Sequence, residues 1–124
     1  MISSNEKPVV LICDDEKGVR ESLKVILSDH YEVLFAENGP DALTLLENNN
    51  AEVVLLDIKM PKLHGLEVLK KIKQLNPSLP VIVVTGYQSV ELAQEALKLG
   101  ALDYIPKPFE SQVLLKTIRE ALRK

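Results

Sequence analysis

The chain has 124 residues, 46% of them hydrophobic and 27% charged, a size and composition typical of one globular domain. Its 15 basic and 18 acidic residues give a formal charge of −3, and only 4% of its residues are aromatic, which argues against direct nucleic-acid binding. The single cysteine, Cys13, excludes an internal disulfide and fits a reducing compartment, and no apolar run approaches the roughly 18–20 residues of a membrane helix. We therefore expect one cytoplasmic domain over residues 1–124, with an ordered core over about 8–122, an N-terminal extension over 1–7 and no membrane contact.

Short apolar runs alternate with amphipathic segments along the whole chain. The runs are rich in β-branched residues and predict buried strands, and the segments carry apolar residues at helical spacing and predict helices. The predicted strands cover 8–13, 31–36, 51–57, 80–85 and 102–105. The predicted helices cover 19–27, 40–47, 66–76, 90–99 and 113–122. Pro40 suits a first helical turn, and Gly100 can end the fourth helix.

This strict alternation predicts the α/β class, with a parallel sheet and helices on both of its faces. Five strand–helix units are too few for a closed eight-fold barrel, which leaves an open sheet. The commonest five-stranded version is the flavodoxin-like (βα)5 three-layer sandwich with strand order 2-1-3-4-5. Ligands of such sheets bind beyond the carboxyl ends of the strands at the switch point, here between strands one and three.

Polar residues of related chemistry stand at the ends of the strands near this point. Strand one ends at Asp14 and Asp15, strand three at Asp57, strand four at Thr85, and strand five runs into Lys107. Three carboxylates in one pocket repel each other, and a single lysine is too little to neutralise them. The pattern therefore indicates a hard divalent cation with oxygen ligands, Mg²⁺ or Mn²⁺.

A site of this kind suits phosphoryl transfer. The metal and Lys107 would neutralise charge on the transferring group, and the Thr85 hydroxyl could donate to a phosphoryl oxygen. Asp57 stands alone at the end of the central strand and is the best-placed nucleophile for an aspartyl-phosphate. Each residue also has a purely structural interpretation, as a helix cap or a solvated turn residue. Those interpretations do not explain why neighbouring strands all end in residues suited to one chemistry.

Four motifs carry a resemblance to a known family over nearly the whole chain. They are Val-Val-Leu-Ile-Cys-Asp-Asp-Glu over 9–16, Val-Val-Leu-Leu-Asp-Ile-Lys-Met-Pro over 53–61 with Gly65 four residues on, Val-Ile-Val-Val-Thr-Gly over 81–86, and Ala-Leu-Asp-Tyr-Ile-Pro-Lys-Pro-Phe over 101–109. In this order and spacing the chain resembles a response-regulator receiver domain of two-component signal transduction, with the fold of the chemotaxis regulator. The last two motifs are also similar to receivers attached to transcriptional activators of the nitrogen-regulatory type.

The resemblance implies a phosphorylation-activated switch without separate substrate turnover. Asp57 would accept a phosphoryl group from a sensor histidine kinase or a phosphotransfer protein. Asp15 would hold Mg²⁺ directly and Asp14 largely through water. Asp57 and the backbone carbonyl of Lys59 would complete the protein part of the metal shell.

The resemblance also implies how the signal would leave the site. Lys107 would pair with the phosphoryl oxygens, and the Lys107–Pro108 peptide bond would be cis. Thr85 would move toward the phosphoryl group while Tyr104 swings inward. This coupling would remodel the face formed by the fourth helix, fifth strand and fifth helix, and so control an output domain or an effector protein.

Two residues of this chain lie where an attacking water would approach the phosphoryl group. Lys59 places a long cation beside the site, and Tyr87 follows Thr85 by two residues. We hypothesise that Lys59 and Tyr87 tune how long the phosphoryl group survives.

The partners follow from the resemblance as well. We expect the kinase to contact the first helix near Val19, Arg20 and Leu23, and we expect an output domain beyond Lys124 or a separate effector. A homodimer on phosphorylation is a further expectation, as is no direct nucleic-acid binding by this domain.

Three other functions fit this sequence less well. A flavodoxin-like redox protein needs a phosphate-binding loop of Ser, Thr or Gly after strand one, where this chain has acidic residues. An aspartyl-phosphate phosphatase usually carries a second Asp two residues after its nucleophile, where this chain has Lys59. A phosphorylation-independent docking module would not need the complete acidic pair, Asp14 and Asp15, together with Asp57, Thr85 and Lys107.

Overall fold

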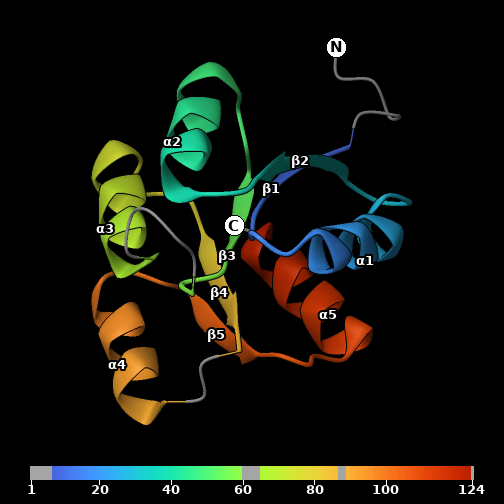
Figure 1. Ribbon diagram of the computed structural model, residues 1–124. Coiled ribbons are helices and arrows are strands. Elements are labelled where there is room, and N and C mark those ends of the chain that lie inside the picture. The colour runs from blue at the N-terminus through green and yellow to red at the C-terminus, as the bar shows by residue number, and fades with distance from the viewer. Residues whose placement is uncertain (1–6, 60–64, 87–88, 124) are drawn as a thin grey trace.

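The computed structural model describes residues 7–59, 65–86 and 89–123, in which strands and helices alternate as predicted (Figure 1). The strands are β1 (Val9–Cys13), β2 (Glu32–Ala36), β3 (Val53–Leu56), β4 (Val81–Thr85) and β5 (Asp103–Pro106). The helices are α1 (Lys17–Leu27), α2 (Gly39–Asn48), α3 (Gly65–Leu75), α4 (Val90–Lys98) and α5 (Ser111–Ala121). None of the helices in these ranges is long and apolar enough to cross a membrane.

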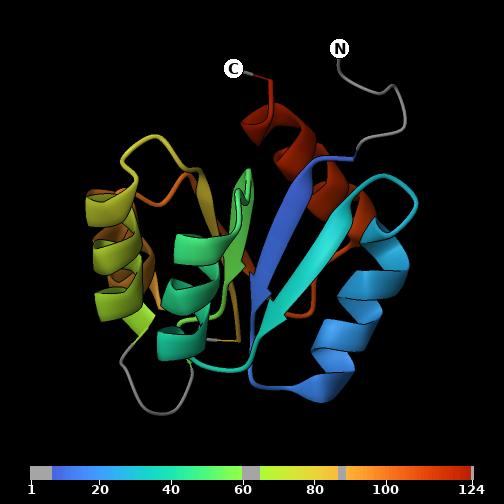
Figure 2. The same cartoon turned by 90° about the horizontal axis from the view of Figure 1, so that it is seen from above.

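The strands form one parallel sheet of order β2-β1-β3-β4-β5, which confirms the predicted fold class. Helices α2, α3 and α4 cover one face of the sheet, and α1 and α5 cover the other (Figures 1 and 2). All carboxyl ends of the strands therefore lie at the same edge, with β1 and β3 adjacent at the switch point.

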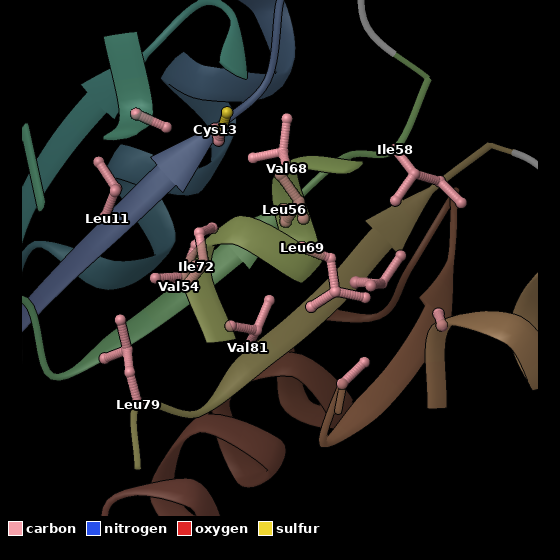
Figure 3. Packing of buried hydrophobic residues seen from close by; sticks show 14 of the residues in the cluster. Leu11, Cys13, Val54, Leu56, Ile58, Val68, Leu69, Ile72, Leu79 and Val81 are labelled. Carbon is pink, nitrogen blue, oxygen red and sulfur yellow. The ribbon is translucent and has the colours of Figure 1, made fainter. Parts of the chain in front are cut away.

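Alternate residues of each central strand belong to two separate hydrophobic cores, because successive side chains of a strand point to opposite faces of the sheet. Leu11, Val54 and Val81 lie on the face of the sheet that α2, α3 and α4 cover. They share one core with Leu69 and Ile72 of α3 (Figure 3). The neighbouring strand residues belong to the second core, which α1 and α5 complete with the side chains Leu23, Leu27, Leu114 and Ile118. Burial on both faces explains why these strands appear in the sequence as continuous apolar runs.

Element ends differ from the prediction by one or two residues. Helices α1 and α5 begin two residues earlier than predicted, because the apolar repeat marks the buried face and not the first turn. Strand β3 stops at Leu56, so Asp57 lies just beyond the strand and not at its last position. The end of α4 was predicted well, since Gly100 follows it with a φ of +110° that favours glycine.

Gly65 lies one residue before the predicted helix over 66–76, but in the structure it is the first residue of α3 and touches the chain just after Asp57. A Cβ atom at this position would lie 2.2 Å from Cα of Ile58, a distance that no side chain tolerates. Close backbone contact therefore requires glycine here and fixes the start of α3 against the end of β3.

We predict that Gly65→Ala lowers the free energy of unfolding by about 1–3 kcal/mol, because the backbone of Ile58 must shift. Gly18→Ala is the matched control, since a Cβ there meets nothing within 4 Å and alanine favours the helix by about 0.5–1 kcal/mol. Urea denaturation followed by circular dichroism measures both. Equal stability of the two variants would show that the contact at Gly65 is unimportant.

Candidate functional site

The ends of four strands bring the predicted site residues together. Asp14 and Asp57 directly follow β1 and β3, Thr85 is the last residue of β4, and Lys107 directly follows β5. Backbone hydrogen bonds continue one step past the strands: Asp57 N donates to Cys13 O at 2.9 Å, and Lys107 N donates to Thr85 O at 2.8 Å. The sheet register therefore fixes where each of these side chains starts.

The Lys107 ammonium lies at the centre of the site. Its Nζ donates to Oδ2 of Asp14 at 2.8 Å, to Oδ2 of Asp57 at 2.9 Å and to Oε1 of Glu16 at 3.2 Å. The side chains of Asp14 and Asp57 are each only 3% exposed, whereas that of Glu16 is 62% exposed. The following Lys107–Pro108 peptide bond is cis, as the resemblance implied.

The two buried carboxylates are held in the same way. Oδ1 of Asp14 accepts from the backbone N–H of Glu16, and Oδ1 of Asp57 accepts from the backbone N–H of Lys59, both at 2.9 Å. In each aspartate, one carboxylate oxygen thus stabilises the turn that follows the strand, and the other accepts a hydrogen bond from Lys107. This pairing fixes the orientation of both carboxylates before any ligand is bound.

Two side-chain contacts of the site were not predicted, although Arg20 was expected to contact the kinase. Glu16 had no predicted role, although it follows the acidic pair in the first motif. Arg20 donates from Nη1 to the backbone carbonyl of Asp14 at 2.9 Å, and its Nη2 lies 3.8 Å from Oε2 of Glu37. Arg20 therefore fastens the β1–α1 loop to the first turns of α1, a role that helical spacing alone does not reveal.

Burial and charge shift several pKa values around the site. Desolvation raises the pKa of Asp14, and the charge of Asp57 adds to the rise, against hydrogen bonds from Lys107 and from the Glu16 N–H. Burial alone would lower the pKa of Lys107, but its hydrogen bonds to Asp14 and Asp57 outweigh this and hold that pKa well above its usual range. Lys107 therefore remains a cation at every physiological pH.

Two neighbouring groups respond to the same environment. Burial, followed by the charge of Asp14, raises the pKa of the Cys13 thiol to about 12, so this cysteine is a neutral core residue and not a nucleophile. Burial also raises the pKa of Tyr104, and the charge of Asp57 raises it further. The ring of Tyr104 is thus close enough to the site to sense the charge on Asp57.

The donor set suits a divalent cation. One oxygen from each of Asp14, Glu16 and Asp57 lies within 4.8 Å of the others. Three carboxylates against one ammonium leave an excess of two negative charges, and carboxylate oxygens are the ligands that Mg²⁺ prefers. This group contains Glu16 in place of the predicted Asp15, which is exposed in the β1–α1 loop.

Comparison with known proteins decides the family. The model of the response regulator receiver domain matches residues 10–119. The chain belongs to this family. Membership implies phosphorylation-activated signalling in a two-component system.

Curated relatives of this receiver domain include regulators that are longer than the chain. The response regulator MprA of Mycobacterium sp. (strain KMS) is 42% identical over 116 residues, which are 93% of this chain and 50% of that protein. The transcriptional regulatory protein ZraR of Klebsiella oxytoca is 42% identical over 120 residues, 96% of this chain and 27% of that protein. The receiver domain thus spans half or less of these relatives.

Solved structures agree with the fold. A CheY-like receiver domain protein from Methanospirillum hungatei JF-1 superposes with a TM-score of 0.90 at 38% identity, covering 94% of both chains. The receiver domain of NtrX from Brucella abortus gives a TM-score of 0.88 at 35% identity, covering 93% of this chain and 98% of that one.

The remaining predicted residues of the receiver domain have different surroundings. Thr85 is fully buried, Tyr104 is half-buried, and the Lys59 side chain is exposed. Tyr87 lies outside the described residues.

A groove of about 650 Å³ runs beside the site between α1 and the β5–α5 loop. Its lining includes Val19 and Ile26 of α1, Phe109 after β5, and Lys107. The prediction that Leu23 contacts a partner is wrong, because Leu23 is 1% exposed and packs into the core beneath α1. Val19 is half-buried and remains available to a partner.

We predict that Asp14→Asn raises the free energy of unfolding at pH 7, because an amide avoids the desolvation penalty of the buried carboxylate. The pKa of Asp14 in the fold lies above its usual 3.8, so the native state binds more protons than the unfolded chain between these two values. The penalty is absent below the lower value and complete above the higher one. The gain should therefore shrink as the pH falls from 7 to 4.

Urea denaturation in EDTA at each pH measures this gain, with the exposed-site variant Asp29→Asn as control. A variant that is less stable than the parent at pH 7, or a gain independent of pH, would contradict the prediction.

Proposed function

We propose that this receiver domain accepts a phosphoryl group on Asp57 from the phosphohistidine of a sensor kinase or phosphotransfer protein. The observation that carries the proposal is the Asp57 carboxylate, which is 3% exposed and held between the Lys59 N–H and the Lys107 ammonium, each at 2.9 Å. One oxygen of Asp57 would form the new bond to phosphorus while the phosphorus–nitrogen bond breaks and the imidazole leaves. Lys107 would then face the phosphoryl oxygens from its present position.

A bound Mg²⁺ would neutralise charge on the transferring phosphoryl group. Asp14, Asp15, Asp57 and the Lys59 carbonyl are the proposed protein ligands, and Mn²⁺ could replace Mg²⁺ at such oxygen ligands. The excess of two negative charges in the group of Asp14, Glu16, Asp57 and Lys107 supports a divalent cation. Asp14 and Asp57 are also fixed by their own loops, so little ordering remains for the metal to impose.

The proposed output is a rearrangement around Thr85 and Tyr104. Thr85 lies at the end of β4, and its backbone carbonyl accepts from Lys107 N, so the ends of β4 and β5 are joined next to Asp57. A dianionic group on Asp57 would attract the Thr85 hydroxyl and favour an inward position of the half-buried Tyr104. This change would alter the face of α4, β5 and α5 that an output domain or effector reads.

Charge and shape support the proposed partners. The groove between α1 and the β5–α5 loop opens beside Lys107, so a kinase or phosphotransfer protein seated there would present its histidine to the site. We propose that the unit over about 8–122 acts in the cytoplasm, that it forms a homodimer when phosphorylated, and that nucleic-acid contacts belong to its partners. The acidic charge of −3 agrees with the last point.

We predict that Asp57→Asn abolishes labelling by a small phosphodonor and by its beryllofluoride mimic, because the amide cannot act as the nucleophile. In the parent protein, labelling should require Mg²⁺ and stop in EDTA. Mass spectrometry detects the phosphoryl group, and fluorine NMR detects beryllofluoride. Asp29→Asn, at an exposed site away from Lys107, should label normally. Labelling of Asp57→Asn would show that another residue is the acceptor.

We predict that Lys59→Asn and Tyr87→Ala change the lifetime of the phosphoryl group, since we expect both positions, two residues after Asp57 and two residues after Thr85, to lie beside the path of the attacking water. The half-life is measured after removal of the phosphodonor, in Mg²⁺ at constant pH. Lys98→Asn, on the exposed surface of α4, serves as the charge control. Unchanged half-lives in both variants would refute a tuning role.

A further inference from the structure

All three hydrogens of the Lys107 ammonium have carboxylate acceptors, but these acceptors are not equivalent. Asp14 and Asp57 are buried and tied to their own loops, whereas Glu16 is 62% exposed at the start of α1. The Nζ–Oε1 distance to Glu16, 3.2 Å, is the longest of the three. Glu16 is thus the outer and weaker partner of Lys107 in the metal-free arrangement.

A divalent cation held by Asp15 and Asp57, with Asp14 bound through water, competes with Lys107 for the oxygens of Asp14 and Asp57. The ammonium and the metal are both positive, so they repel each other across the few ångströms that separate the carboxylates. Lys107 must then give up at least one bond to a buried aspartate. Its stem is anchored by the β5–α5 loop, and among the described residues Glu16 is a further carboxylate already within its reach.

We propose that Glu16 is a positioning residue that raises the Mg²⁺ affinity of the site by holding Lys107 when the metal engages Asp57 directly and Asp14 through water. The Glu16–Lys107 bond is a minor contact while both buried aspartates hold Lys107, and it carries a larger share of the ammonium charge when the metal weakens those two bonds. Glu16 therefore stabilises the metal-bound state more than the metal-free state, and only this difference changes affinity. The inference rests on the proposed Mg²⁺ site and adds a residue to it.

Two mechanisms would give Glu16 an influence on metal binding, and they differ in their dependence on Lys107. If Glu16 acts through Lys107, its effect disappears when residue 107 carries no charge. If Glu16 acts as a metal ligand or as a general negative charge, its effect persists. A double-mutant cycle separates these possibilities.

The test is calorimetric titration of the unphosphorylated protein with Mg²⁺ at fixed pH and ionic strength. Glu16→Gln should bind Mg²⁺ about threefold to tenfold more weakly, the range expected for a partly exposed ion pair or charged hydrogen bond. Glu110→Gln removes an equal charge from the β5–α5 loop, which also carries Lys107, at a side chain that does not contact Lys107. This variant should bind Mg²⁺ like the parent. In a Lys107→Met background, Glu16→Gln should change the affinity less than twofold.

A second measurement does not need the Lys107→Met variant. Reductive methylation followed by peptide mass spectrometry reports how accessible the Lys107 amine is. In saturating Mg²⁺, the Lys107 amine should be protected from methylation in the parent and more reactive in Glu16→Gln. Circular dichroism provides the control that the Glu16→Gln variant is folded under these conditions.

Three results would overturn the inference. Equal Mg²⁺ affinity of Glu16→Gln and the parent would exclude any role for Glu16. An undiminished effect in the Lys107→Met background, or unchanged protection of Lys107, would exclude a role through Lys107 while leaving the metal site intact. Absence of Mg²⁺ binding to the parent itself would instead overturn the proposed metal site, and with it this inference.

Discussion

The contact between one ammonium and three carboxylates is the interaction on which the site depends. Lys107 compensates only part of the charge that Asp14, Asp57 and Glu16 bring together, so the arrangement is permanently short of positive charge. Burial strengthens this imbalance, because Asp14 and Asp57 have little solvent to screen them. Attraction to the Lys107 ammonium therefore holds the three carboxylates together, and the negative charge that remains favours the binding of a further cation.

The parallel sheet makes this crowding of charge possible. Two hydrophobic cores hold β1, β3 and β4 rigidly, and their common direction delivers every strand end to one edge. Backbone hydrogen bonds from Asp57 to Cys13 and from Lys107 to Thr85 carry that order just past the strands. Burial of the apolar strands thus stabilises a site whose three carboxylates, taken alone, would repel each other.

The sequence predicted the fold and the strand ends well, because both depend on patterns that a chain displays directly. Alternation of apolar runs and amphipathic segments determined the class, and residues at the ends of the runs determined the site. The contacts of Glu16 and Arg20 within the site were missed because they depend on the direction in which a side chain leaves the first turns of α1, which spacing does not define. The expected partner contact at Leu23 was wrong because Leu23 lies on the apolar repeat of α1, which faces the core.

Asp14 and Asp57 share one geometry but need not share one role. In both residues one oxygen accepts from an N–H two residues on and the other accepts from Lys107, yet Asp57 directly follows the central strand β3, and its charge raises the pKa of Tyr104. A new charge on Asp57 would reach Tyr104 through space and β4 through the Lys107–Thr85 backbone bond. Asp14 is joined to β2 instead, because its backbone N–H donates to the carbonyl of Ala36, on the side of β1 that lies away from β3. The order of strands therefore places Asp57, and not its geometric twin, beside the strand that leads to α4 and pairs with β5.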